Sequence, residues 1–230
     1  MASRPVFSAV GTPEHLVHET LVSFSWNPGF ASVQKKKNVT AMHAAAKSQG
    51  LFPLLEVSTK SELELGRRLS AFSLKIHTEI GEISLESAFQ GSKVFEGGGP
   101  YVDIYEGDAW AAKKDERLKT SGALVGFNFF GQEWPLVPKT AFYDWLYLSA
   151  LQPHQEFLKR LEYFRGFTDI EFNPQRSINC QARTCALLVS LIKLNALDDA
   201  LRTQGDFIAV VASDSFKQNH SADLKQSLLL

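Results

Sequence analysis

Gly81-Glu-Ile-Ser-Leu-Glu-Ser-Ala-Phe-Gln-Gly-Ser-Lys-Val-Phe95 is the stretch that says most about the fold and its chemistry. Its first residues alternate in polarity, which predicts a short strand leading into a helix. Glu86, Gln90 and Lys93 follow at i, i+4 and i+7, so a helix through all three would place an acid, an amide and an amine on one face. Such spacing is common on solvated helices, but the neighbouring apolar residues leave little room for a separate buried face. We therefore expect the three side chains to line a cleft.

The composition favours one soluble domain. The chain has 230 residues, 44% of them hydrophobic, and can bury a sizeable core. A formal net charge of −1 provides no broad basic surface, so any contact with nucleic acid must be local. Cys180 and Cys185 lie close together in an apolar segment, which predicts buried free thiols. No apolar run is suited to a membrane span. We expect a cytoplasmic protein with one domain over residues 1–213 and a flexible tail over 214–230.

The order of strand and helix patterns predicts an α+β fold, predominantly helical with a small antiparallel sheet. Strands are expected within residues 5–26, 53–57, 73–84 and 123–130, and helices over 31–50, 61–68, 110–119, 139–151, 155–164 and 179–194. The glycine-rich segment 96–100 is expected to be a turn and residues 167–174 a loop.

Several common catalytic motifs are absent from the sequence. The six histidines show no His-Glu-x-x-His spacing, which disfavours a metalloenzyme. There is no Gly-x-x-x-x-Gly-Lys-Ser/Thr phosphate loop and no Gly-x-Ser-x-Gly nucleophile elbow. Gly97-Gly-Gly-Pro100 lacks the strand-to-helix context of a phosphate cradle, so it is better interpreted as a turn.

Two further clusters of polar residues accompany the Glu86 segment. Trp26-Asn-Pro-Gly-Phe30 precedes Gln34-Lys-Lys-Lys-Asn38 on a predicted helix. Successive helical residues point about 100° apart, so Lys35 and Lys37 could turn inward while Lys36 stays solvated; a basic solvated turn is the plainer alternative. Asp169, Glu171 and Asn173 form the other cluster, for which loop capping is the alternative.

Together these clusters resemble the NADAR superfamily of N-glycosidases. The resemblance lies in Leu69–Leu74, Gly81, the pattern Glu86-x-x-Phe89-Gln90-x-x-Lys93, and the acidic loop at Asp169 before a helix that opens near Asn179. It is closer to the branch encoded beside DarT-type toxins, which ADP-ribosylate guanine in DNA; segments 26–39, 138–147, 167–174 and 177–182 carry that likeness. Most of residues 24–194 is covered.

The resemblance implies an antitoxin that removes ADP-ribose from guanine bases in DNA without a cofactor. Glu86 would stabilise or protonate the reacting centre, and Asp169 would position water or ribose hydroxyls. Lys35 or Lys37 would be the amine of a Schiff-base route, in which a desolvated lysine attacks ribose C1. Lys93 has three alternative roles: it would be the amine in place of Lys35 or Lys37, it would contact the pyrophosphate, or it would neutralise Glu86. The remaining expected substrate contacts are Trp26, Gln34, Phe72, Gln90, Tyr143 and Asn179.

Two alternatives stay open beside this hypothesis. One is a hydrolase of small N-ribosides. The other is a non-catalytic protein that reads ADP-ribose or blocks its toxin by contact. The expected partners are ADP-ribosylated DNA and ADP-ribose, with a cognate DarT-type toxin as a further candidate and no membrane.

Overall fold

The chain opens with a long antiparallel hairpin of β1 (Ala2–Thr12) and β2 (His15–Phe24) in the computed structural model, which describes residues 1–13, 15–175 and 177–213. β9 (Gly166–Thr168) pairs antiparallel with β1 and parallel with β3 (Leu54–Glu56). The result is a four-stranded sheet in the order β2-β1-β9-β3. The tail predicted over residues 214–230 lies outside the described residues.

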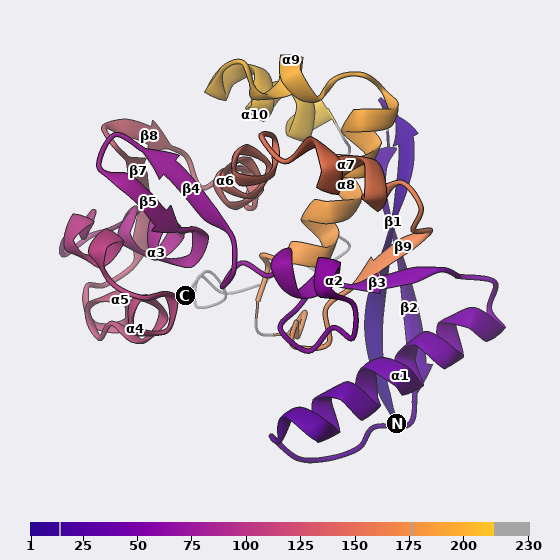
Figure 1. Cartoon of the computed structure of the whole chain (residues 1–230). Helices are drawn as coiled ribbons and strands as arrows, with labels where there is room; N and C mark the ends of the chain where they lie inside the picture. The colour runs from indigo at the N-terminus through magenta and orange to yellow at the C-terminus, as the bar shows by residue number, and fades with distance from the viewer. Residues whose placement is uncertain (14, 176, 214–230) are drawn as a thin grey trace.

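Two helices cover opposite faces of this sheet: α1 (Ser32–Ser48) and α8 (Gln181–Lys193). Neighbouring strand residues point to opposite faces, and accordingly Val6 packs in a cluster with Met42 of α1, whereas Phe7 belongs to the larger core that includes α8. Figure 1 shows α8 beside β1 and α1 across the lower end of the hairpin. The parallel pairing of β3 with β9 brings the end of β9 beside a segment far away in sequence.

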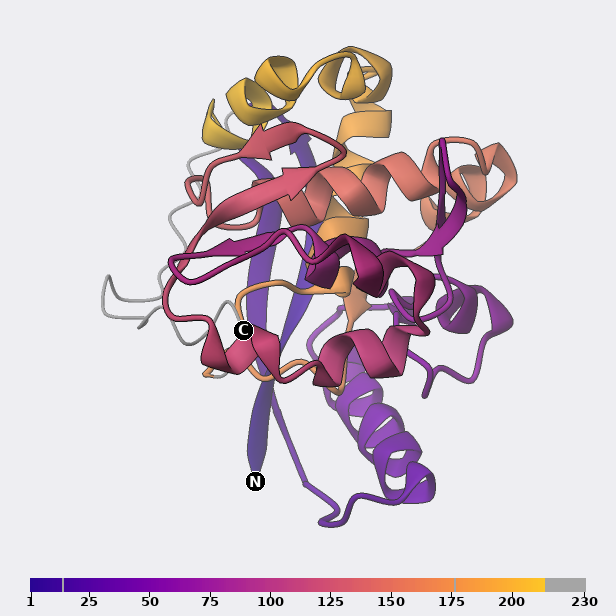
Figure 2. The same cartoon turned by 90° about the vertical axis from the view of Figure 1, so that its left-hand side faces the viewer.

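A second region lies on the other side of α6 (Ala141–Leu151) from this sheet, at the left of Figure 1. It comprises α3 (Leu85–Gly91), the hairpin β4 (Lys75–Thr78) and β5 (Gly81–Ser84), and an antiparallel sheet of β6 (Lys93–Phe95), β7 (Leu124–Phe129) and β8 (Gln132–Trp134). The 3-10 helix η1 (Val102–Glu106), α4 (Ala109–Lys114) and α5 (Arg117–Thr120) complete this region. Figure 2 brings α4 and α5 to the front.

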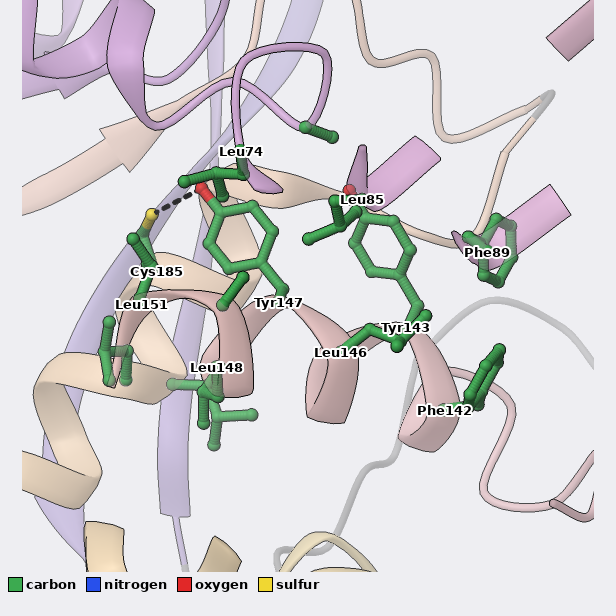
Figure 3. Close-up of a cluster of buried hydrophobic side chains, with 14 of the residues drawn as sticks. Leu74, Leu85, Phe89, Phe142, Tyr143, Leu146, Tyr147, Leu148, Leu151 and Cys185 are labelled. Atoms are coloured by element: carbon green, nitrogen blue, oxygen red, sulfur yellow. Dashed lines mark hydrogen bonds between the residues drawn. The ribbon is translucent and has the colours of Figure 1, made fainter. Parts of the chain in front are cut away.

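The core is centred on α6, whose aromatic and aliphatic side chains are almost all buried. Figure 3 shows Tyr143 and Tyr147 projecting from this helix among leucine side chains. The Tyr147 hydroxyl donates to the Leu69 carbonyl oxygen at 2.5 Å and contacts Cys185 Sγ at 3.3 Å. Cys180 and Cys185 are both buried free thiols, as predicted. The remaining helices are α2 (Glu64–Arg68), α7 (Gln155–Leu161), α9 (Leu197–Leu201) and α10 (Gln204–Ser213).

A buried ion pair joins α6 to α8. Asp144, which is 1% exposed, accepts hydrogen bonds from Arg183 Nη1 at 3.0 Å and Thr184 Oγ1 at 2.5 Å. Removing the Asp144 carboxylate takes a counter-charge and two hydrogen-bond acceptors out of a buried site, and breaking such a pair is strongly destabilising. Asp144→Ala is therefore expected to lower the free energy of unfolding by about 3 kcal/mol, measured by urea denaturation. Asp199→Ala removes the exposed partner of Arg202 and should have no measurable effect. Equal midpoints for the two variants would contradict this assignment.

The prediction of an α+β fold is confirmed, and the structure adds detail that the sequence did not reveal. The main sheet is four-stranded and contains a parallel pair, so it is larger than the small antiparallel sheet expected. The expected loop over 167–174 begins with strand residues of β9, and β8, α9 and α10 were not predicted. Within the described residues, no helix is both long enough and apolar enough to cross a membrane.

Several predicted helices have different bounds in the structure. The helix carrying Glu86 ends at Gly91, and Lys93 instead begins β6, where it pairs with Phe127 of β7. The helix expected over residues 110–119 is two short ones, because Asp115 has an extended ψ of 125° and accepts a hydrogen bond from the Arg117 amide. The α6 and α8 helices each begin two residues later than expected.

Candidate functional site

A cavity of about 310 Å³ lies between α3 and α4 on one side and residues from the segments 169–172 and 177–181 on the other. Residues from the segment 70–72, ahead of β4, close it further. Seven of the residues predicted from the sequence line this cavity: Phe72, Glu86, Gln90, Lys93, Tyr143, Asp169 and Asn179. They come from separate parts of the chain, and the fold brings them together.

Glu86 occupies the first turn of α3. Ser84 caps this helix by accepting a hydrogen bond from the Ser87 amide at 3.0 Å, which fixes the direction in which the first turn points. The Glu86 carboxylate is buried and accepts a hydrogen bond from Gln90 Nε2 at 2.9 Å. Gln90 Oε1 is buried and accepts no hydrogen bond within the described residues. The amide therefore orients the carboxylate and has an acceptor left for a ligand hydroxyl.

Lys93 reaches the cavity from β6 rather than from the helix. The prediction that it continues the helical face is wrong, yet the strand carries it to the same wall as Glu86. Lys93 is 0% exposed, and its Nζ lies 5.0 Å from the centre of the Phe89 ring. Burial lowers its pKa to about 8, assisted by the charge of Lys113 and opposed by that of Glu86. About a tenth of this amine is therefore neutral at pH 7, far more than for a lysine with an ordinary pKa.

The glycine turn supports the backbone of Lys93. Gly99 has a φ of +97°, and a Cβ there would lie 2.3 Å from the Lys93 carbonyl oxygen. Only glycine fits both the conformation and this close approach. The interpretation of Gly97-Gly-Gly-Pro100 as a turn is thus confirmed, and the turn helps to hold Lys93 in place.

Asp169 follows directly after β9 and is held by three donors. Its Oδ1 accepts the backbone amides of Glu171 at 3.0 Å and Phe172 at 3.3 Å, and its Oδ2 accepts Gln181 Nε2 at 3.0 Å. Gln181 Oε1 in turn accepts the Ala71 amide at 2.8 Å, which ties the Asp169 loop to the segment 70–72. Burial raises the pKa of Asp169 to about 6, against the effect of the Glu171 amide. Asp169 thus caps its own loop and also lines the cavity.

Glu56 is a second buried carboxyl near Asp169, and it was not among the residues predicted from the sequence. It accepts hydrogen bonds from Ser58 Oγ at 2.6 Å, Thr168 Oγ1 at 2.7 Å and the Ile170 amide at 2.9 Å. These bonds hold both residues that flank Asp169. Burial, together with the charge of Asp169, raises the pKa of Glu56 to about 8. A glutamate within the predicted buried strand 53–57 was the signal that could have identified it.

The raised pKa of Glu56 makes stability depend on pH. The folded protein holds this proton more tightly than the unfolded chain, so the contribution is full below about pH 4.5 and is lost as the pH rises through about 8. The raised pKa of Asp169 also lowers the stability as the pH rises, but this loss is complete above about pH 6. Glu56→Gln should therefore flatten the decline in unfolding free energy between about pH 6 and 8, measured by urea denaturation at several pH values. Glu62→Gln, at an exposed position, should keep the wild-type slope; an unchanged slope in Glu56→Gln would refute the assignment.

Aromatic side chains line the rest of the cavity. Tyr143 is 7% exposed, and its ring meets Phe89 edge-on at 5.3 Å. Burial, followed by the negative charge of Glu86, raises the pKa of Tyr143 well above its usual value, so its hydroxyl remains a protonated donor. Trp110 and Lys113 of α4 also line the cavity and were not predicted. Their i,i+3 spacing on one helical face was the available signal.

The predicted residues around α1 do not line the cavity: Trp26, Gln34, Lys35 and Lys37. Trp26 packs on Phe24 and beneath the guanidinium of Arg4. Lys37 is exposed, and Lys35 and Gln34 are half-buried.

Asn38 explains part of this motif. Its side chain accepts a hydrogen bond from the Asn27 amide at 2.7 Å and donates one to the Asn27 carbonyl oxygen at 2.9 Å, which holds the preceding loop against α1.

Within the part of the chain that the structure describes, no three His, Cys, Asp or Glu side chains lie close enough together to hold a metal ion.

Comparison with known proteins identifies the family. A family model described as "DarT1-associated NADAR antitoxin" matches residues 2–221, which include both walls of the cavity. A comparison with curated proteins found no match. Since the family model covers nearly the whole sequence, the chain belongs to the family of DarT1-associated NADAR antitoxins.

Proposed function

We propose that this protein is an N-glycosidase that removes ADP-ribose from guanine bases in DNA and so reverses the action of a DarT-type toxin. The observation that carries the proposal is the gathering of three buried ionisable side chains, Glu86, Lys93 and Asp169, around one cavity. The association with DarT1 in the family description supports the toxin as the source of the modification.

The bond to be broken joins ribose C1 to a base nitrogen, and positive charge develops at C1 as it weakens. A carboxylate fixed beside that carbon stabilises the charge most effectively in a site shielded from water. Glu86 suits this role because it is buried and is oriented by Gln90. Asp169, held by Gln181 and two backbone amides, suits the positioning of water or ribose hydroxyls.

We assign the amine of the Schiff-base route to Lys93. In that route the ribose ring opens as O4 takes a proton, leaving C1 doubly bonded to the base nitrogen. The neutral Lys93 amine adds to C1, and the base nitrogen leaves with a proton, which forms an imine between Lys93 and ribose. Water hydrolyses this imine to the aldehyde, which recloses, and the lysine is freed. Lys93 has the lowered pKa that the step needs and lines the cavity with Glu86, whereas Lys35 and Lys37 do not line it.

The products on both sides of the bond test this proposal. A DNA oligonucleotide carrying ADP-ribosylated guanine should yield free ADP-ribose and an oligonucleotide with intact guanine, each identified by mass spectrometry. An abasic site in the DNA, or cleavage within the pyrophosphate, would contradict the proposed bond. The wild-type protein after heat denaturation is the control.

The size of the cavity favours one other candidate, the hydrolysis of small N-ribosides. Pockets for drug-sized ligands span roughly 300–1,000 Å³, and this cavity of about 310 Å³ lies at the lower end. Competition between modified DNA and a free ribosylamino-pyrimidine separates the two. We expect modified DNA to be processed preferentially, and a preference for the small riboside would favour the alternative.

A further inference from the structure

The mouth of the cavity carries a stacked aromatic pair. Phe72 and Trp110 have ring centres 4.6 Å apart and planes inclined by 27°, and both residues line the cavity. Trp110 is nevertheless 57% exposed. One face of the indole is thus supported by Phe72 while much of the ring remains open to solvent. Large exposed aromatics at a cavity mouth are common ligand contacts, because a flat ring offers contact area at a small entropic cost.

Lys113 places a positive charge beside this pair. Its Nζ lies 5.2 Å from the centre of the Phe72 ring, and Lys113 lines the same cavity. None of the ion pairs found within residues 1–13, 15–175 and 177–213 involves Lys113. Its charge can therefore pair with an anionic ligand group at the mouth.

The local sequence fixes the positions of both residues. Asp108 caps α4 by accepting the amides of Trp110 at 2.8 Å and Ala111 at 2.9 Å. This cap sets the first turn, and Trp110 and Lys113 then share one face of the helix at i and i+3. α4 lies on the side of the molecule that faces the viewer in Figure 2. An indole and an ammonium group are thus held side by side at the entrance.

The volume of the cavity indicates what such an entrance would contact. ADP-ribose contains two riboses, a pyrophosphate and a purine, and a cavity of about 310 Å³ is small for all of it. The ribose that is released must lie deep, next to Glu86 and Lys93. The pyrophosphate and the adenosine at the other end then extend outward past the mouth.

We propose that Phe72, Trp110 and Lys113 form a subsite for the nucleotide end of ADP-ribose, in which adenine stacks on the open face of Trp110 and the pyrophosphate pairs with Lys113. This inference rests on the proposed function for the identity of the ligand. It concerns binding rather than turnover, so it is measured without any reaction.

Calorimetric titration of the full chain with ADP-ribose tests the subsite. Loss of one base–aromatic stack typically weakens binding by roughly 10- to 100-fold. Trp110→Ala should therefore lose about that much affinity for ADP-ribose, while Trp110→Phe should keep most of it. Ribose 5-phosphate, which lacks the adenosine end, should bind wild type and Trp110→Ala equally. Lys113→Ala should weaken the binding of ADP-ribose but leave the binding of adenosine unchanged.

Two matched variants control for general effects. Tyr163→Ala removes an aromatic that is 71% exposed and packed on a phenylalanine, Phe164, but lies outside the cavity lining. Lys114→Ala removes the exposed lysine next to Lys113. Both should bind ADP-ribose as the wild type does.

Three outcomes would overturn the subsite. They are unchanged ADP-ribose binding by Trp110→Ala, an equal loss for ribose 5-phosphate, and no ADP-ribose binding by the wild type. If Trp110→Ala instead loses affinity for unmodified single-stranded DNA alone, the indole contacts a DNA base and the proposal is wrong. A protein that binds ADP-ribose through Trp110 but releases none from DNA would refute the proposed function and leave the subsite standing.

Discussion

Glu86→Gln is expected to slow the release of ADP-ribose from modified DNA by about 10²- to 10³-fold while leaving the protein folded. The substitution keeps the shape of the side chain and removes the charge that stabilises the developing cation at C1. Gln90 Oε1 accepts no hydrogen bond within the described residues, so it can accept one from the new amide, and the buried pair stays satisfied. Single-turnover rates and thermal unfolding of the same preparations give both quantities.

Glu171→Gln is the matched control for this variant. Glu171 also lines the cavity but is exposed, so its charge is screened by solvent. We expect its rate to stay within a few-fold of the wild type. Equal rates for Glu86→Gln and wild type, with both proteins folded, would remove Glu86 from the reaction.

Lys93 should be the residue that becomes covalently attached to ribose. Cyanoborohydride added during turnover would reduce the imine to a stable amine, and peptide mass spectrometry should locate the adduct on Lys93. Lys93→Met keeps an unbranched side chain without placing a charge in the core, and it should lower the single-turnover rate by at least about 10³-fold because the nucleophile is lost. The neutral amine is the reactive form, so the wild-type rate should rise as the pH approaches about 8.

Lys35→Ala and Lys37→Ala are the controls, since the sequence allowed either to be the amine. Both should retain the adduct on Lys93. An adduct on Lys35 or Lys37 would mean that the start of α1 approaches the cavity during the reaction. Rapid turnover without any adduct would instead favour direct attack by water.

Local patterns in the sequence predicted the parts of the site that depend on short-range structure. The i,i+4 spacing of Glu86 and Gln90 predicts that their side chains meet on one face of α3, and the hydrogen bond between them confirms this contact. The strand hairpin and the glycine turn were also predicted, because alternation and glycine clusters are local signals. The family resemblance carried the rest of the prediction, including the link between Asp169 and Glu86.

Long-range packing set the features that the sequence did not reveal. The helix ends at Gly91, and Lys93 pairs instead with Phe127 of β7, a long-range pairing that no spacing within the segment encodes. β9 forms only through pairing with β1 and β3, and Glu56 acts on the Asp169 loop only because of that pairing. The resemblance led to the prediction that Lys35 and Lys37 belong to the site. Their helix, α1, instead covers the face of the sheet opposite to α8.

The most direct test of the proposed function is the number of ADP-ribose molecules released by each protein molecule. DNA carrying ADP-ribosylated guanine is supplied in large excess over the protein, and free ADP-ribose is followed until the reaction stops. An N-glycosidase regenerates its site, so many equivalents of ADP-ribose should be released and the DNA should be fully restored. Release that stops at one equivalent or less, with the remaining DNA still modified, would contradict catalysis and indicate a protein that only binds.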